Sequence, residues 1–259
     1  MSVLTMPEPA NWSTGRARVV WICGAVAVVL SGSVYWAVRA VLRGEYLTVI
    51  GLSGIVVFPL LMVMALALVM LGRTSLRGSF DSSGSTLRTD RTFEGCFYVG
   101  LVATIVGGAV LVRYLPTGTL AIPMSRGWQI FSPALVVVAI VFAVIGLVSA
   151  WRRGGLGYVK LTPAGVDIAN ILSTQSVRWD DIVGVADYSD VNTKTRKAIV
   201  LRLEDGVEKV VDGADFYAPR GAGLYWMVRH YWRHPDERAE LTDGRALERL
   251  SGQRFDVGE

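Results

Sequence analysis

Hydrophobic positions in the first 150 residues gather in four long stretches. They cover about residues 19–41, 46–71, 95–113 and 129–150, and charged residues occur in them only near an end. At 1.5 Å per residue, about 20 apolar residues cross a bilayer core of about 30 Å. Aromatic residues that favour the membrane–water boundary stand at the ends, for example Tyr46, Trp128 and Trp151. The pattern predicts a membrane domain of four transmembrane helices over residues 19–150.

The hydrophobic period changes after residue 151. Short alternating runs broken by turn residues are typical of an antiparallel β domain. An Asp205-Gly206 pair joins two of these runs and favours a tight hairpin. Apolar positions then recur at helical spacing from Leu224 to Tyr231, ahead of Pro235. We therefore expect a small β domain capped by a C-terminal helix over residues 151–234, followed by an extension over 235–259. The expected strands are 158–161, 166–171, 176–179, 182–186, 198–204 and 207–211.

The loop over residues 72–94 is the longest connection between the predicted spans. Its centre is small and polar, whereas its flanks alternate enough to form short strands or a segment lying on a surface. The predicted topology places this loop in the same compartment as the tail, on which it can dock.

Two short motifs in the tail carry a resemblance. Leu161-Thr162-Pro163-Ala164-Gly165-Val166 and, downstream, Trp179-Asp180-Asp181-Ile182 resemble the hydrophobic-Thr-Pro-x-Gly-hydrophobic and Trp-x-x-Ile patterns of bacterial pleckstrin-homology (PH)-like domains tied to membrane helices. The resemblance covers roughly residues 158–232. It implies a partly open barrel of about seven strands capped by a helix, and a binding role in place of catalysis. It names no ligand, and only Lys160 precedes the first turn, where lipid-binding members carry basic residues.

Arginine placement predicts the orientation. The N-terminal segment 1–18, the loop 72–94 and the start of the tail hold more arginines than the other two loops, and such residues favour the cytoplasmic side. Both termini are therefore expected in the cytoplasm and the protein in the bacterial inner (plasma) membrane. The eight arginines on one side are Arg16, Arg18, Arg73, Arg77, Arg88, Arg91, Arg152 and Arg153, against Arg39, Arg43, Arg113 and Arg126 on the other.

The amino-acid composition further narrows the class of protein to which the chain can belong. Of 259 residues, 52% are hydrophobic and only 19% charged, which argues against an ordinary soluble enzyme. The net charge of +4 is dispersed over membrane flanks and tail, so we expect no nucleic-acid partner. No nucleophile elbow, phosphate-binding glycine loop or paired-cysteine motif is present, and we expect neither enzymatic activity nor a cofactor. The glycine pairs Gly51 and Gly54, and Gly107 and Gly108, are expected to permit close helix packing.

One basic cluster is a candidate binding site. Lys194, Arg196 and Lys197 place three cations within four residues, enough to hold an anionic lipid headgroup or an acidic partner. The alternative is a solvated loop between strands.

The two histidines of the chain, His230 and His234, are spaced i and i+4 on the expected helix. That spacing can place two imidazoles on one face for a metal ion. Tyr231, however, stands where a metalloprotease motif needs glutamate, so they are weak candidates and we expect no metal site.

These observations favour a non-enzymatic scaffold or recruiter. Its cytoplasmic domain would bind a protein partner or the anionic leaflet, and the chain is compatible with a homo-oligomer. An accessory subunit of a transport or secretion complex is the alternative, and a membrane-embedded enzyme is the least favoured class.

Overall fold

The computed structural model describes residues 6–12, 16–120, 122, 124–170, 173–191 and 195–257, and only the backbone for most of residues 16–30. The chain divides into two compact units. We call Arg16–Leu66 with Glu94–Arg152 the helical unit, and Met1–Gly15, Ala67–Phe93 and Arg153–Glu259 the sheet unit. The sheet unit thus draws on three separate parts of the sequence.

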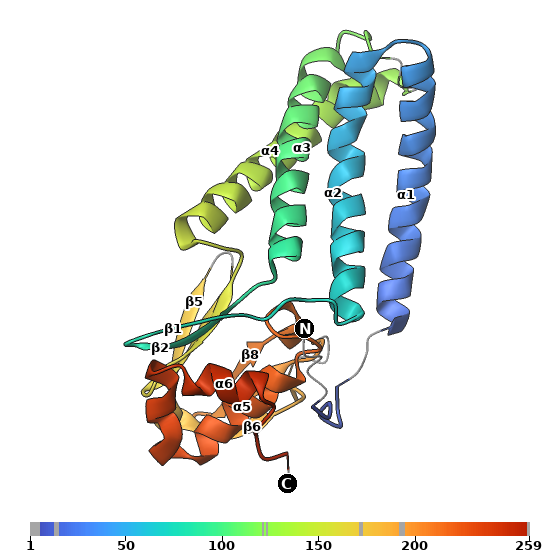
Figure 1. The fold of residues 1–259 in the computed structure, drawn as a ribbon. Helices are drawn as coiled ribbons and strands as arrows, with labels where there is room; N and C mark the ends of the chain where they lie inside the picture. The colour runs from blue at the N-terminus through green and yellow to red at the C-terminus, as the bar shows by residue number, and fades with distance from the viewer. Residues whose placement is uncertain are drawn as a thin grey trace. The chain divides into compact units, whose positions relative to one another are not determined.

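Four long helices account for the hydrophobic stretches: α1 (Arg16–Leu42), α2 (Tyr46–Met70), α3 (Arg91–Tyr114) and α4 (Arg126–Arg153) (Figure 1). Among the described residues, α2, α3 and α4 are long and apolar enough to cross a membrane. Large apolar side chains on them are exposed, including Ile130 and Phe142 on α4, as expected for surfaces that face lipid. The predicted span 19–41 falls within α1, where most side chains lie outside the described part.

Glycines bring α2 and α3 together within the helical unit. A Cβ atom on Gly107 would lie 2.5 Å from the backbone N of Gly54, so the two backbones touch where neither residue has a side chain. Small residues drive such contacts in membranes because they let helix backbones approach closely. The packing role expected of Gly54 and Gly107 is confirmed.

The sheet unit contains two antiparallel sheets. Each expected strand of the tail is present, with ends that differ by at most two residues from the prediction. The five-stranded sheet has the order β1-β2-β3-β4-β5 and the three-stranded sheet the order β6-β7-β8. The strands are β1 (Arg77–Asp81), β2 (Gly84–Arg88), β3 (Tyr158–Leu161), β4 (Gly165–Ala169), β5 (Thr174–Arg178), β6 (Ile182–Ala186), β7 (Ile199–Leu203) and β8 (Glu208–Val211).

The predicted PH-like barrel is not confirmed, because no barrel closes among the described strands. The first sheet is instead extended by β1 and β2, which come from the loop over 72–94. β2 pairs with β3 in antiparallel register, with Leu87 opposite Val159, and Figure 1 shows these teal strands beside the yellow strands of the tail. The Nζ atom of Lys160 on β3 also reaches Asp81 Oδ2 on β1, at 2.9 Å.

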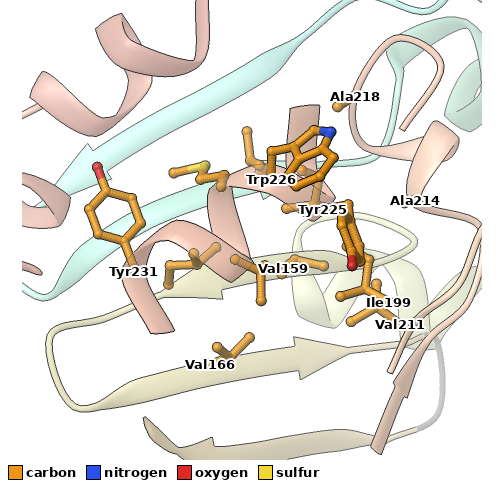
Figure 2. Packing of buried hydrophobic residues seen from close by; sticks show 14 of the residues in the cluster. Val159, Val166, Ile199, Val211, Ala214, Ala218, Tyr225, Trp226 and Tyr231 are labelled. Atoms are coloured by element: carbon orange, nitrogen blue, oxygen red, sulfur yellow. The ribbon is translucent and has the colours of Figure 1, made fainter. Parts of the chain in front are cut away.

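Helix α5 (Ala222–Arg233) packs its apolar side chains on the strands to form the core of the sheet unit. Figure 2 shows Tyr225 and Trp226 of this helix with Val159, Ile199 and Val211 of the strands. Leu87, from the loop, is fully buried in the same core.

Residues after Pro235 also belong to this core, although the sequence suggested a separate extension. Leu241 of a 3-10 segment, η3 (Pro235–Thr242), Leu250 of helix α6 (Arg245–Ser251) and Phe255 after α6 are buried in it. Ser85 Oγ of β2 donates a 2.7 Å hydrogen bond to the carbonyl of Leu241. The C-terminal residues therefore stabilise the strands contributed by the loop.

The N-terminal segment docks on the same unit. Met6 and Trp12 are buried in its core. The indole of Trp12 donates to the carbonyl of Ala198 at 2.9 Å, and the indole of Trp226 donates to the carbonyl of Pro7 at the same distance. Residues 6–12 are thus a structural part of the sheet unit.

Candidate functional site

The Thr162–Gly165 turn and Trp179, from the two motifs singled out in the sequence, contact each other in the sheet unit. Thr162 and Gly165 exchange backbone hydrogen bonds across the tight turn between β3 and β4. The indole of Trp179 donates to the Thr162 carbonyl at 2.8 Å. Any Cβ on Gly165 would lie 2.1 Å from the Val177 carbonyl oxygen, so only glycine fits there. The motifs thus fix a three-strand corner by sterics and hydrogen bonding, a structural role.

Arg196 of the basic cluster faces inward. Its guanidinium makes two hydrogen bonds of 2.7 and 2.8 Å to the carboxylate of Asp215, whose side chain is 1% exposed. It also stacks over the ring of Phe216, at 5.1 Å. Burial raises the pKa of Asp215, against the lowering effect of Arg196. This bidentate pair holds the segment before β7 against the segment before α5.

Lys197 is likewise engaged inside the unit. Its Nζ atom lies 2.6 Å from Glu8 Oε1 and 3.0 Å from the carbonyl of Arg220, and it sits over the ring of Trp12. Lys194 lies outside the described residues. Two of the three cations are therefore paired within the sheet unit. Arg196 binds Asp215, and Lys197 binds Glu8 of the N-terminal segment and the carbonyl of Arg220, just before α5.

His230 and His234 lie beside each other, with ring centroids 4.7 Å apart. His230 Nε2 is 2.8 Å from Glu237 Oε2, and Arg249 pairs with the same carboxylate oxygen at 2.8 Å. Burial lowers the pKa of His230, although its bond to Glu237 acts the other way. Among the described residues, no group of three or more His, Cys, Asp or Glu side chains is placed to hold a metal ion. The cluster joins α5 to η3 and α6.

Strand β5 forms an edge of the five-stranded sheet, and four of its five residues are exposed. The Asn170 N–H donates to the Ser173 carbonyl at 2.8 Å, and the Trp179 N–H donates to the Ala164 carbonyl at 3.1 Å. Because bonding positions alternate along an antiparallel pair, Gln175 and Val177 bond to β4, and the backbone of Ser176 points away from it. The edge thus offers backbone donors and acceptors to another strand.

Three arginines that the sequence suggested only as orientation signals share a pocket. Arg77, Arg88 and Arg91 line a cavity of about 530 Å³ together with Ser75, Leu76, Gly78 and Ser79. The sequence could not reveal this grouping, because it depends on the hairpin that sets Arg77 opposite Arg88.

Comparisons with known proteins add no relative. No family model matches this chain, and neither a curated protein nor a solved structure matches it. The functional conclusion therefore rests on the chain's own geometry.

Proposed function

We propose that this chain is a four-span membrane protein whose sheet unit, PH-like in its motifs, recruits a protein partner at the cytoplasmic face of the inner membrane. The observation that carries the proposal is that three separate parts of the chain form the sheet unit. These parts lie before α1, between α2 and α3, and after α4. A domain attached to four helix ends is held at the membrane, which raises its effective concentration for a partner that is also at the membrane.

The assembly of the sheet unit from these three parts also supports α1 as a fourth span. Residues 6–12 and β1 and β2 belong to one folded unit and must lie in one compartment. The chain between them therefore crosses the membrane an even number of times, so α2 requires α1 as a second crossing. The loop with β1 and β2 and the tail also belong to one unit, so α3 likewise requires α4 as a second crossing. The arginine bias supports the cytoplasm as this shared compartment.

The binding surface that we assign to this function is the edge of β5. An extended segment of a partner protein can add a strand there, with affinity from backbone hydrogen bonds and specificity from the side chains. The polar side chains Thr174, Gln175, Ser176 and Arg178 keep the edge soluble when it has no partner.

Affinity purification of the full chain from mild detergent tests the proposal, with bound proteins identified by mass spectrometry. Ser176→Pro removes the outward N–H and leaves the bonds to β4, whereas the matched control Ser176→Ala keeps that N–H. We expect a stable partner with the parent chain and with the alanine variant, and its loss with proline.

Two outcomes would contradict the proposal. Recovery of no partner from several detergents argues against recruitment. A partner that survives Ser176→Pro with the sheet still folded binds elsewhere, and if it is a transporter or secretion subunit, the accessory-subunit alternative replaces ours.

A further inference from the structure

A cavity of about 610 Å³ lies between α3 and α4 in the helical unit. Most of its lining is apolar, including Ala109 and Val112 on α3 and Val137 and Val141 on α4. The side chains of Val137 and Val141 are 44% and 50% exposed, so the cavity opens at the surface of the unit. On a membrane-spanning helix such a surface faces lipid. The cavity can therefore accept an apolar chain from the surrounding membrane.

One wall of this cavity is fixed by close packing of the two helices. A Cβ atom on Gly108 of α3 would lie 2.9 Å from Ile140 Cγ1 and 3.2 Å from Val136 Cγ1, both on α4. Ile140 also lines the cavity. The contact at Gly108 thus sets the position of Ile140, and a wall that is already in place is typical of ligand sites.

Arg113 is the single charged residue among those that line the cavity. It is the penultimate residue of α3 (Arg91–Tyr114), and its guanidinium lies 5.6 Å from the centre of the Tyr114 ring. The side chain is exposed, and no carboxylate in the described part of the chain forms an ion pair with it. A guanidinium carries five N–H donors in a planar fork, so Arg113 is able to bind an external oxyanion.

The sequence around Arg113 indicates its depth in the membrane. The uncharged part of α3 ends at Val112, and a polar turn over residues 117–119 follows the helix. Tyr114 is a residue of the kind that favours the membrane–water boundary. Arg113 is therefore expected at the level of the lipid headgroups, beside a cavity whose other walls suit an acyl chain.

We propose that the cavity binds an anionic phospholipid, with one acyl chain between α3 and α4 and the phosphate on Arg113. A guanidinium matches phosphate oxygens with two short, charge-assisted bonds. A zwitterionic lipid brings its own cation to the phosphate, which competes with Arg113, and a soluble phosphoester leaves the apolar walls unfilled. The cavity volume lies within the usual range of small-molecule sites.

Native mass spectrometry of the full chain in mild detergent measures lipid retention, with phosphatidylglycerol and phosphatidylcholine of identical acyl chains offered together. Arg113→Gln removes the charge. Arg126→Gln is its control, because Arg126 is exposed at the first residue of α4 and does not line the cavity. Val141→Trp fills the apolar part, and Val138→Trp is its control, because Val138 is 52% exposed on the same helix but lies outside the lining. Thermal melts check that each variant is folded.

We expect the parent chain to retain phosphatidylglycerol in preference to phosphatidylcholine. Arg113→Gln should weaken retention of phosphatidylglycerol about tenfold, in line with the loss of charge-assisted hydrogen bonds, and Arg126→Gln should change it less than twofold. Val141→Trp should reduce retention of both lipids, whereas Val138→Trp should not.

Three outcomes would overturn the proposal. Equal retention of the two lipids by the parent chain, or equal weakening by Arg113→Gln and Arg126→Gln, shows an unselective shell of lipid. Binding of glycerol 1-phosphate as tight as that of phosphatidylglycerol shows that the acyl chain contributes nothing. None of these results depends on whether a protein partner binds β5.

Discussion

Leu87 offers a direct test of how the loop over 72–94 contributes to the sheet unit. The residue lies on β2 between two spanning helices in the sequence, yet it is fully buried in the core with Val159 opposite it on β3. Leu87→Ala removes three carbons, a transfer loss of about 2.4 kcal/mol at about 0.8 kcal/mol each. The cavity adds to this, so we expect a loss of about 2–5 kcal/mol.

Hydrogen exchange of the full chain in detergent measures this loss of stability at the amides of β3 and β4, which lie in the tail, far from Leu87 in the sequence. Their protection should fall by a factor of about 30 or more if opening follows the stability of the unit. Val207→Ala, at a half-exposed site outside the core, is the control and should cost under about 0.5 kcal/mol. Unchanged protection of β3 in Leu87→Ala would refute the claim that the loop and the tail fold as one unit.

Three further predictions concern other parts of the chain. Gly107→Ala should force α2 and α3 apart and lower the melting temperature in detergent, whereas Gly95→Ala, with open space at its Cβ, should not. Arg196→Gln should cost about 3–5 kcal/mol in chemical denaturation because it strands a buried carboxylate, while Arg178→Gln, in an exposed pair, should cost under about 1 kcal/mol. Because burial lowers the pKa of His230, the unfolded chain binds the proton more tightly; stability should fall as pH drops below about 6.5, and His230→Gln should flatten that dependence in thermal melts.

Much of the fold follows from local sequence signals. The uncharged runs predict the long helices because a spanning helix needs about 20 apolar residues, and alternation with turn residues predicts the strands of the tail. The docking of the loop over 72–94 on the tail was suggested only by the predicted topology, which places both in the same compartment. Its pairing with β3 depends on contacts such as that of Leu87 with Val159, about 70 positions apart in the sequence, and no local pattern encodes such a partner.

The candidate sites were harder to predict for the same reason. Arg196 and Lys197 look like free cations in the sequence, because their partners Asp215 and Glu8 are distant along the chain. Conversely, Arg77, Arg88 and Arg91 look dispersed until the hairpin groups them. Charge spacing in the sequence does not specify which groups surround a cation in the fold.

The interleaving of sheet and helices also constrains how the protein is made. β1 and β2 are synthesised before α3 and α4, and they wait for β3 until both helices have been inserted. Non-local pairing of this kind forms late and leaves the apolar side chain of Leu87 exposed in the meantime. A chain that inserts one helix in the wrong direction puts β2 and β3 in different compartments, where Leu87 has no core to enter. In the topology that we propose, the sheet can therefore be completed only after both helices have been inserted in the correct direction.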